Sequence, residues 1–140
     1  MNNFLKAYLE CMLGSSTDDD DNPLAKKYGI EDCDPSLILN AEADIAVFLD
    51  KVEEVLGPDM RAKLTDEKKP FSSGRLTFYC TKACLAGHDF WLSRNGHGTG
   101  FFDREDYIYG GQEINNKLQE IAKSFGELWP YVGDTGRIYT

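Results

Sequence analysis

The sequence contains 140 residues, carries a formal net charge of -9 at pH 7, and is 41% hydrophobic and 12% aromatic. These values are typical of a folded globular chain and exclude a disordered one, and the length indicates a single domain over residues 1–140. No apolar run approaches the roughly 18 residues of a membrane span, and the N-terminus has no signal-peptide pattern. We therefore expect no contact with a membrane.

The negative charge is concentrated in the first half of the chain. Residues 1–70 contain 16 acidic and 8 basic residues, a net charge of -8, whereas residues 71–140 contain 8 acidic and 7 basic residues, a net charge of -1. An acidic surface repels nucleic-acid phosphates and attracts basic partners. We therefore expect a protein partner and no direct contact with nucleic acid, and the alternative is that the acidity serves solubility alone.

A helix and an acidic loop are the first predicted elements. Apolar residues with helical spacing predict an amphipathic helix over about residues 2–13. Adjacent carboxylates repel one another, so the run that follows favours a solvated loop; it consists of Asp18, Asp19, Asp20 and Asp21. The alternatives are a contact surface for a basic partner and a metal site, although the spacing is unlike that of a calcium loop.

The clearest predicted helix begins at Asp34 and Pro35, as N-cap and first helical residue, and ends at Gly57. Apolar residues three or four apart form one face. The other face is acidic, and we interpret it as solvated, with a partner contact as the alternative. Its candidate contact residues are Glu42, Asp50, Glu53 and Glu54.

The middle of the chain is less clear. Residues 58–74 are polar and Lys-rich and predict a connector. Residues 76–85 favour a strand by propensity and a helix by apolar spacing, and we predict a helix. The four cysteines form no CxxC pair, so we expect reduced, buried thiols. Cys80 and Cys84 could join two histidines in a zinc site, but their spacing is not one of the recurrent patterns.

A β-hairpin is predicted over residues 86–104, because two apolar β-rich runs flank Asn95-Gly96, a pair typical of a tight turn. A helix is predicted over residues 112–125, and a closing hairpin turns through residues 133–136. The expected fold class is therefore α+β: an acidic helical part, residues 1–57, packs on a small antiparallel sheet supplied by a hairpin-helix-hairpin part, residues 86–140.

His88, Asp89 and His97 are the candidate catalytic residues, because a histidine paired with a carboxylate can act as a general base or bind a metal. In a regular strand, His88 and Asp89 would lie on opposite faces and His97 at the turn, so the three would not converge. A structural hairpin and an exposed binding tip that includes Arg94, Asn95 and His97 are the alternatives. No sequence motif for a cofactor or a metal is present, and we predict neither.

Three segments carry a resemblance to a known family. LGSSTDDDDNPL, AGHDFWLSRNGHGTGFFDR and LWPYVGDTGRIY, in that order along the chain, resemble a family of small proteins encoded by tailed bacteriophages. The family has no agreed activity. The resemblance implies a protein that works in the cytoplasm of an infected bacterium, and it implies nothing about residues 58–85.

The leading functional hypothesis is a small acidic phage accessory protein that is not an enzyme and that binds and inhibits or modulates a host protein. Host takeover and counter-defence, such as anti-restriction or anti-CRISPR activity, are processes of this kind. One alternative is a DNA mimic that occupies a nucleic-acid-binding site. The other is a small metal-dependent hydrolase that uses His88, Asp89 and His97.

Overall fold

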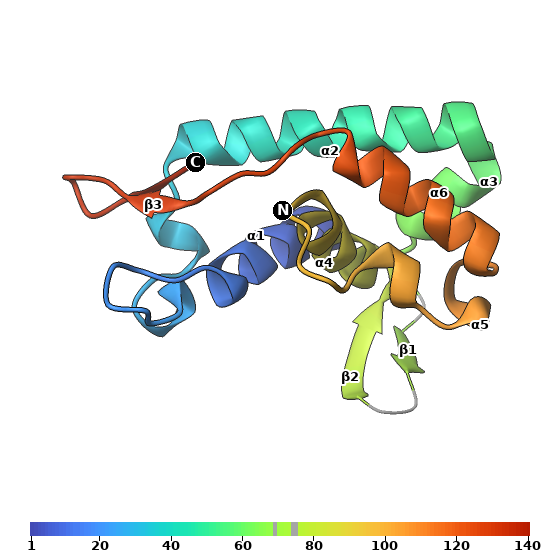
Figure 1. Cartoon of the computed structure of the whole chain (residues 1–140), viewed down its shortest axis with the longest axis horizontal. Coiled ribbons are helices and arrows are strands. Elements are labelled where there is room, and N and C mark those ends of the chain that lie inside the picture. The colour runs from blue at the N-terminus through green and yellow to red at the C-terminus, as the bar shows by residue number, and fades with distance from the viewer. Residues whose placement is uncertain (69, 74–75) are drawn as a thin grey trace.

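A computed structural model describes residues 1–68, 70–73 and 76–140, with the backbone alone described for 70–73 and 76–80. The chain is mostly helical, and Figure 1 shows the helices stacked around a central pair, α1 and α4. The helices are α1 (Asn3–Ser15), α2 (Pro35–Leu56), α3 (Pro58–Leu64), α4 (Lys82–Arg94), α5 (Asp106–Tyr109) and α6 (Gln112–Lys123), with short 3-10 turns η1 (Leu24–Lys26), η2 (Ile30–Asp32) and η3 (Phe101–Asp103). The strands are β1 (Pro70–Ser73), β2 (Leu76–Thr81), β3 (Tyr131–Val132) and β4 (Ile138–Tyr139).

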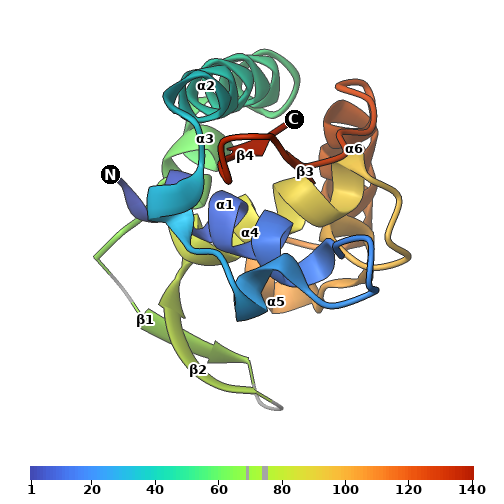
Figure 2. The same ribbon diagram turned by 90° about the vertical axis from the view of Figure 1, so that its left-hand side faces the viewer.

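Helices α1 and α4 lie side by side at the centre of the molecule (Figure 2). A glycine makes this approach feasible, since a Cβ atom at Gly87 would lie 2.1 Å from the backbone oxygen of Phe4. Aromatic side chains fill the space around the crossing, with Tyr8 edge-on to Trp91 at 5.3 Å between ring centroids. The two helices therefore form the centre of the core.

Helix α2, which forms where the sequence predicted a helix, covers this pair along one side. The Asp34 side chain accepts a hydrogen bond from the backbone N–H of Ser36 at 2.9 Å and so caps the helix, while Gly57 follows its last residue. The ring of Phe48 stacks on Phe90 of α4 at 4.3 Å between centroids and on Phe101 at 5.7 Å. Helix α6 packs against both α2 and α4 and completes the core.

The C-terminal hairpin lies at the end of the molecule that is farthest from α5 and α6 (Figure 1). Strands β3 and β4 are antiparallel, with Tyr131 opposite Tyr139 and Val132 opposite Ile138, which confirms the predicted closing hairpin. The Asp34 N–H donates to the carbonyl oxygen of Ile138 at 2.9 Å. This bond places the hairpin at the N-terminal end of α2, beside the acidic loop (Figure 1).

The predicted α+β fold is wrong, because the hairpin expected over residues 86–104 does not form. Its first half belongs to α4, and its second half is a loop that leads into η3. The alternation of apolar and polar residues suggested a strand, but Asp89, Ser93 and Arg94 are buried with the apolar residues around them. A helix buried on nearly all sides has no polar face, so its period is hidden.

The helix predicted over residues 76–85 is also wrong in its first half. Residues 76–81 form β2, which pairs with β1, and the helix begins only at Lys82. The Thr81 side chain accepts a hydrogen bond from the backbone N–H of Cys84 at 3.2 Å and caps α4. The β propensity of the apolar run thus prevailed over its spacing up to that cap.

Candidate functional site

The candidate partner-contact residue Arg94 lies in the core instead of on a hairpin tip. Its side chain is 3% exposed. The guanidinium donates to the Tyr8 hydroxyl at 3.0 Å, to the Asp44 carboxylate at 2.8 Å, and to the carbonyl oxygens of Phe125 and Gly126 at 3.1 and 2.9 Å. Arg94 therefore joins α1, α2, α4 and the end of α6, and it is unavailable to a partner.

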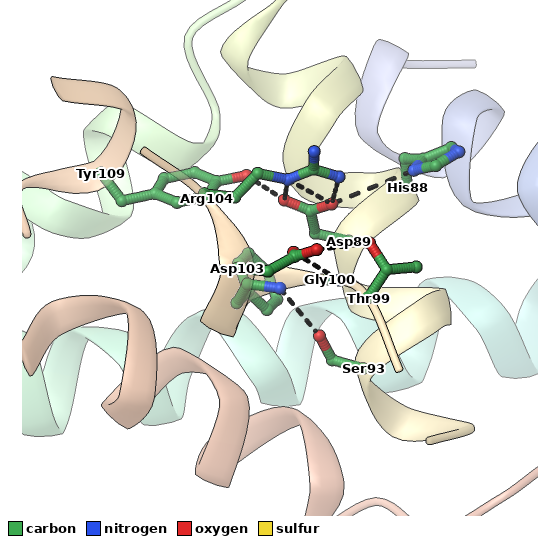
Figure 3. Close-up of polar contacts among 9 residues, drawn as sticks. His88, Asp89, Ser93, Thr99, Gly100, Asp103, Arg104 and Tyr109 are labelled. Atoms are coloured by element: carbon green, nitrogen blue, oxygen red, sulfur yellow. Dashed lines mark hydrogen bonds and ion pairs between the residues drawn. The ribbon is translucent and has the colours of Figure 1, made fainter. Parts of the chain in front are cut away.

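Asp89 is fully buried, and neighbouring side chains hold its carboxylate in place (Figure 3). The Arg104 Nε donates to Asp89 Oδ2 at 2.9 Å, its Nη2 contacts Oδ1, and the Tyr109 hydroxyl donates to Oδ2 at 2.8 Å. Burial alone would lower the pKa of Arg104, but the hydrogen bonds and charge of Asp89 outweigh it and raise that pKa above its ordinary value. The carboxylate is thus held by a fixed cation and a phenol.

The two histidines do not complete a catalytic group with Asp89. The His88 ring is 47% exposed, and its Nδ1 lies 3.9 Å from Asp89 Oδ1, beyond hydrogen-bond distance. His97 lies on the exposed loop after α4. Within the described residues, no group of three or more His, Cys, Asp or Glu side chains could hold a metal ion. Cys84 belongs to these described residues, whereas the side chain of Cys80 lies outside them.

Asn95, the remaining candidate from the predicted tip, serves the fold. Its side-chain amide donates to the carbonyl oxygen of Trp91 at 2.9 Å, and its side-chain oxygen accepts from the N–H of Leu128 at 2.8 Å. These bonds end α4 and fix the segment that leads to the C-terminal hairpin. Of the three candidate contact residues Arg94, Asn95 and His97, only His97 is exposed.

The acidic face of α2 is partly neutralised by the chain itself. Arg61 of α3 pairs with Asp50 at 2.6 Å and with Glu53 at 3.1 Å, and Asp44 pairs with Arg94. Two of the four candidate contact residues on this face are therefore already engaged. Glu42 and Glu54 are exposed.

The run of four aspartates forms a tight loop that the side chain of Asp18 stabilises. The Asp18 carboxylate accepts hydrogen bonds from the backbone N–H groups of Asp20 at 2.9 Å and Asn22 at 3.0 Å. The Asp18 N–H in turn donates to the carbonyl oxygen of Asn22 at 2.9 Å. Asp19, Asp20 and Asp21 are exposed, so the loop presents three adjacent carboxylates at the surface.

A cleft of about 390 Å³ separates this loop from the C-terminal hairpin. The segment 17–28 contributes acidic, apolar and aromatic residues, and the hairpin side contributes apolar and aromatic residues. The lining residues are Thr17, Asp18, Asp19, Asp20, Leu24, Tyr28, Pro130, Tyr131 and Val132. In Figure 1 the loop and the hairpin form the end of the molecule farthest from α5 and α6.

The aromatic side of the cleft was not among the predicted site residues. Tyr131 is 55% exposed and Val132 is 38% exposed, and the neighbouring Trp129 is 72% exposed. Apolar side chains of this size seldom gather at a free surface without a function. The signal in the sequence was the apolar run around Pro130, in a hairpin of two strands that has too little partner surface to cover it.

No protein-family model, curated protein or solved structure matches this chain. Among the helices of the described part of the chain, none combines the length and apolar character that crossing a bilayer requires.

Proposed function

We propose that this protein is a small acidic accessory protein of a tailed bacteriophage that binds a basic surface of a host protein and inhibits or modulates it. The partner contacts the cleft between residues 17–28 and residues 130–132. The phage protein acts in the cytoplasm of the infected cell. The phage setting rests on the resemblance of the three sequence segments, and the binding mode rests on the cleft.

The observation that carries the binding mode is the coincidence of exposed carboxylates and exposed aromatic side chains at one end of the molecule. Asp19 and Asp20 face a cleft whose other wall includes the exposed Tyr131. Interfaces are enriched in aromatic residues at their centre, and charged groups at the rim select and steer a partner of opposite charge. A basic protein surface with apolar side chains meets both requirements.

Two other surfaces fit this role less well. The carboxylates of α2 are partly neutralised, since Arg61 engages Asp50 and Glu53. The predicted hairpin tip does not exist, and Arg94 and Asn95 are used inside the fold. The hydrolase hypothesis required a metal ion, and no group of His, Cys, Asp or Glu side chains among the described residues could hold one, so we do not propose a hydrolase.

The test is capture of a host protein by the tagged full chain, with paired charge variants. We expect one host protein in stoichiometric amount, released at high salt because the contact is electrostatic in part. The double variant Asp19→Asn/Asp20→Asn should lose it. The matched variant Glu42→Gln/Glu54→Gln removes the same charge from α2 and should retain it. Equal retention by both variants, or loss with the α2 variant alone, would contradict the proposed site.

A further inference from the structure

We infer that the cleft is a recognition pocket for an arginine side chain of the partner. This inference rests on the proposed binding function and specifies its ligand. It follows from three kinds of group that line one hollow: carboxylates, tyrosine rings and an apolar floor.

The carboxylates supply the charge. Asp18 is occupied by backbone N–H groups of its own loop, so its role is to hold the loop in shape. Asp19 and Asp20 line the cleft beside it and are exposed. A guanidinium group presents five N–H donors in a planar fork, which matches carboxylate oxygens better than the compact ammonium group of lysine does.

The rings supply the preference for a planar cation. Tyr28 and Tyr131 both line the cleft. Tyr131 stacks on Tyr139 across the hairpin at 5.8 Å between ring centroids and still keeps 55% of its surface exposed. An arginine guanidinium stacks on such rings, with a favourable interaction between the cation and the π face.

The floor and the size of the cleft fit the rest of the side chain. Leu24, 1% exposed, lies at the bottom, and Pro130 contributes to one wall. The three methylene groups of arginine can cover such a surface while the charged head meets the carboxylates. A volume of about 390 Å³ is at the lower end of the range for ligand pockets, so the cleft suits one long side chain and its adjoining backbone.

The test uses three short blocked peptides that differ in one residue: arginine, lysine or citrulline, which has the shape of arginine without its charge. Binding to the isotope-labelled full chain is measured from backbone amide chemical shifts. The arginine peptide should shift residues 17–28 and 129–132, the lysine peptide should bind roughly two- to fivefold more weakly, and the citrulline peptide should not saturate. Equal binding of arginine and lysine, or shifts centred elsewhere, would overturn the inference.

Two variants assign the preference to the named groups. Tyr131→Leu should reduce arginine binding to the level of lysine, whereas Tyr107→Leu, an equally exposed tyrosine on α5, should leave it unchanged. Asp19→Asn/Asp20→Asn should abolish binding of both cationic peptides. If the peptides fail to bind but the host protein is still captured through Asp19 and Asp20, the arginine pocket is wrong and the proposed function stands. If the peptides bind but no host protein is captured, the proposed function fails and the pocket stands.

Discussion

Asp89, Ser93 and Arg94 lie in the interior of the protein, and each is hydrogen-bonded to residues outside α4. Asp89 holds Arg104 and Tyr109, and the Ser93 hydroxyl accepts a hydrogen bond from the Phe101 N–H at 3.1 Å. Unpaired polar groups in a core are costly, so these bonds are conditions of the fold. Asp89, a candidate catalytic residue, and Arg94, a candidate contact residue, therefore serve stability.

The first prediction concerns Arg94. Arg94→Met should destabilise the protein by about 3 kcal/mol, because it removes the donor for the Tyr8 hydroxyl and two backbone carbonyl groups and leaves Asp44 unpaired. Arg61→Met breaks an exposed ion pair and should leave the unfolding midpoint almost unchanged. Chemical denaturation of both variants checks this, and equal losses would show that the Arg94 bonds add nothing beyond a surface pair.

The second prediction concerns alkaline pH. Burial raises the pKa of the Cys11 thiol from 9.0 to about 12, with the charge of Asp89 adding to the effect, and burial raises the pKa of Tyr8 from 10.0 to about 12. As the pH rises, the unfolded chain releases these protons before the folded protein does. The contribution of these groups to the free energy of unfolding is therefore fully present below about pH 9 and is lost as the pH rises towards 12.

The loss should reach at most about 1.4 kcal/mol per pH unit for each group. Cys11→Ala removes one group of raised pKa, so its unfolding midpoint should fall less steeply with pH than that of the wild type. Denaturant titrations across the alkaline range measure both slopes. Parallel slopes for the two proteins would contradict the assignment to Cys11.

At the level of the elements, the pairing of α1 with α4 determines the architecture, and Gly87 sets its distance. Gly87→Ala would force a methyl group into the backbone of Phe4 and should destabilise the protein by about 1–3 kcal/mol or more. Gly14 lies in α1 with no atom within 4 Å of the added carbon, so Gly14→Ala should stabilise by about 0.5–1 kcal/mol. Thermal unfolding of the two variants compares them directly, and a neutral Gly87→Ala would contradict the close approach.

Sequence reasoning worked where an element carries its own signals. Helix α2 has an N-cap, a proline at its start, a glycine at its end and one apolar face, and it forms as predicted. Helix α6 and the closing hairpin also form where expected. Helix α4 was not predicted as a helix, because its buried polar residues form hydrogen bonds with Arg104, Tyr109 and other residues outside the helix that no local pattern reveals.

The same distinction applies to the candidate site. The acidic loop was predictable, because four adjacent aspartates repel one another whatever surrounds them. The opposite wall of the cleft depends on the bond between Asp34 and Ile138, which brings the C-terminal hairpin to the N-terminal end of α2. Such a long-range contact joins residues more than a hundred positions apart, so Tyr131 could not be placed beside Asp20 from the sequence.

At the scale of the whole molecule, the net charge of -9 is not spread evenly over the surface. Arg61 and Arg94 engage carboxylates of α2, whereas Asp19 and Asp20 remain exposed beside a cleft with aromatic residues on its far side. Exposed carboxylates therefore lie at the end of the molecule that also offers apolar contact. This arrangement is the basis of the proposed binding function.

Amide hydrogen exchange of the chain, alone and with the captured host protein, tests that proposal most directly. Exchange reports which backbone amides become protected when a partner covers them. The proposal predicts slower exchange in residues 17–28 and 129–132, and no change along the outer face of α2 or in the loop around His97. Protection centred on α2 or on His97, with the cleft unchanged, would contradict it.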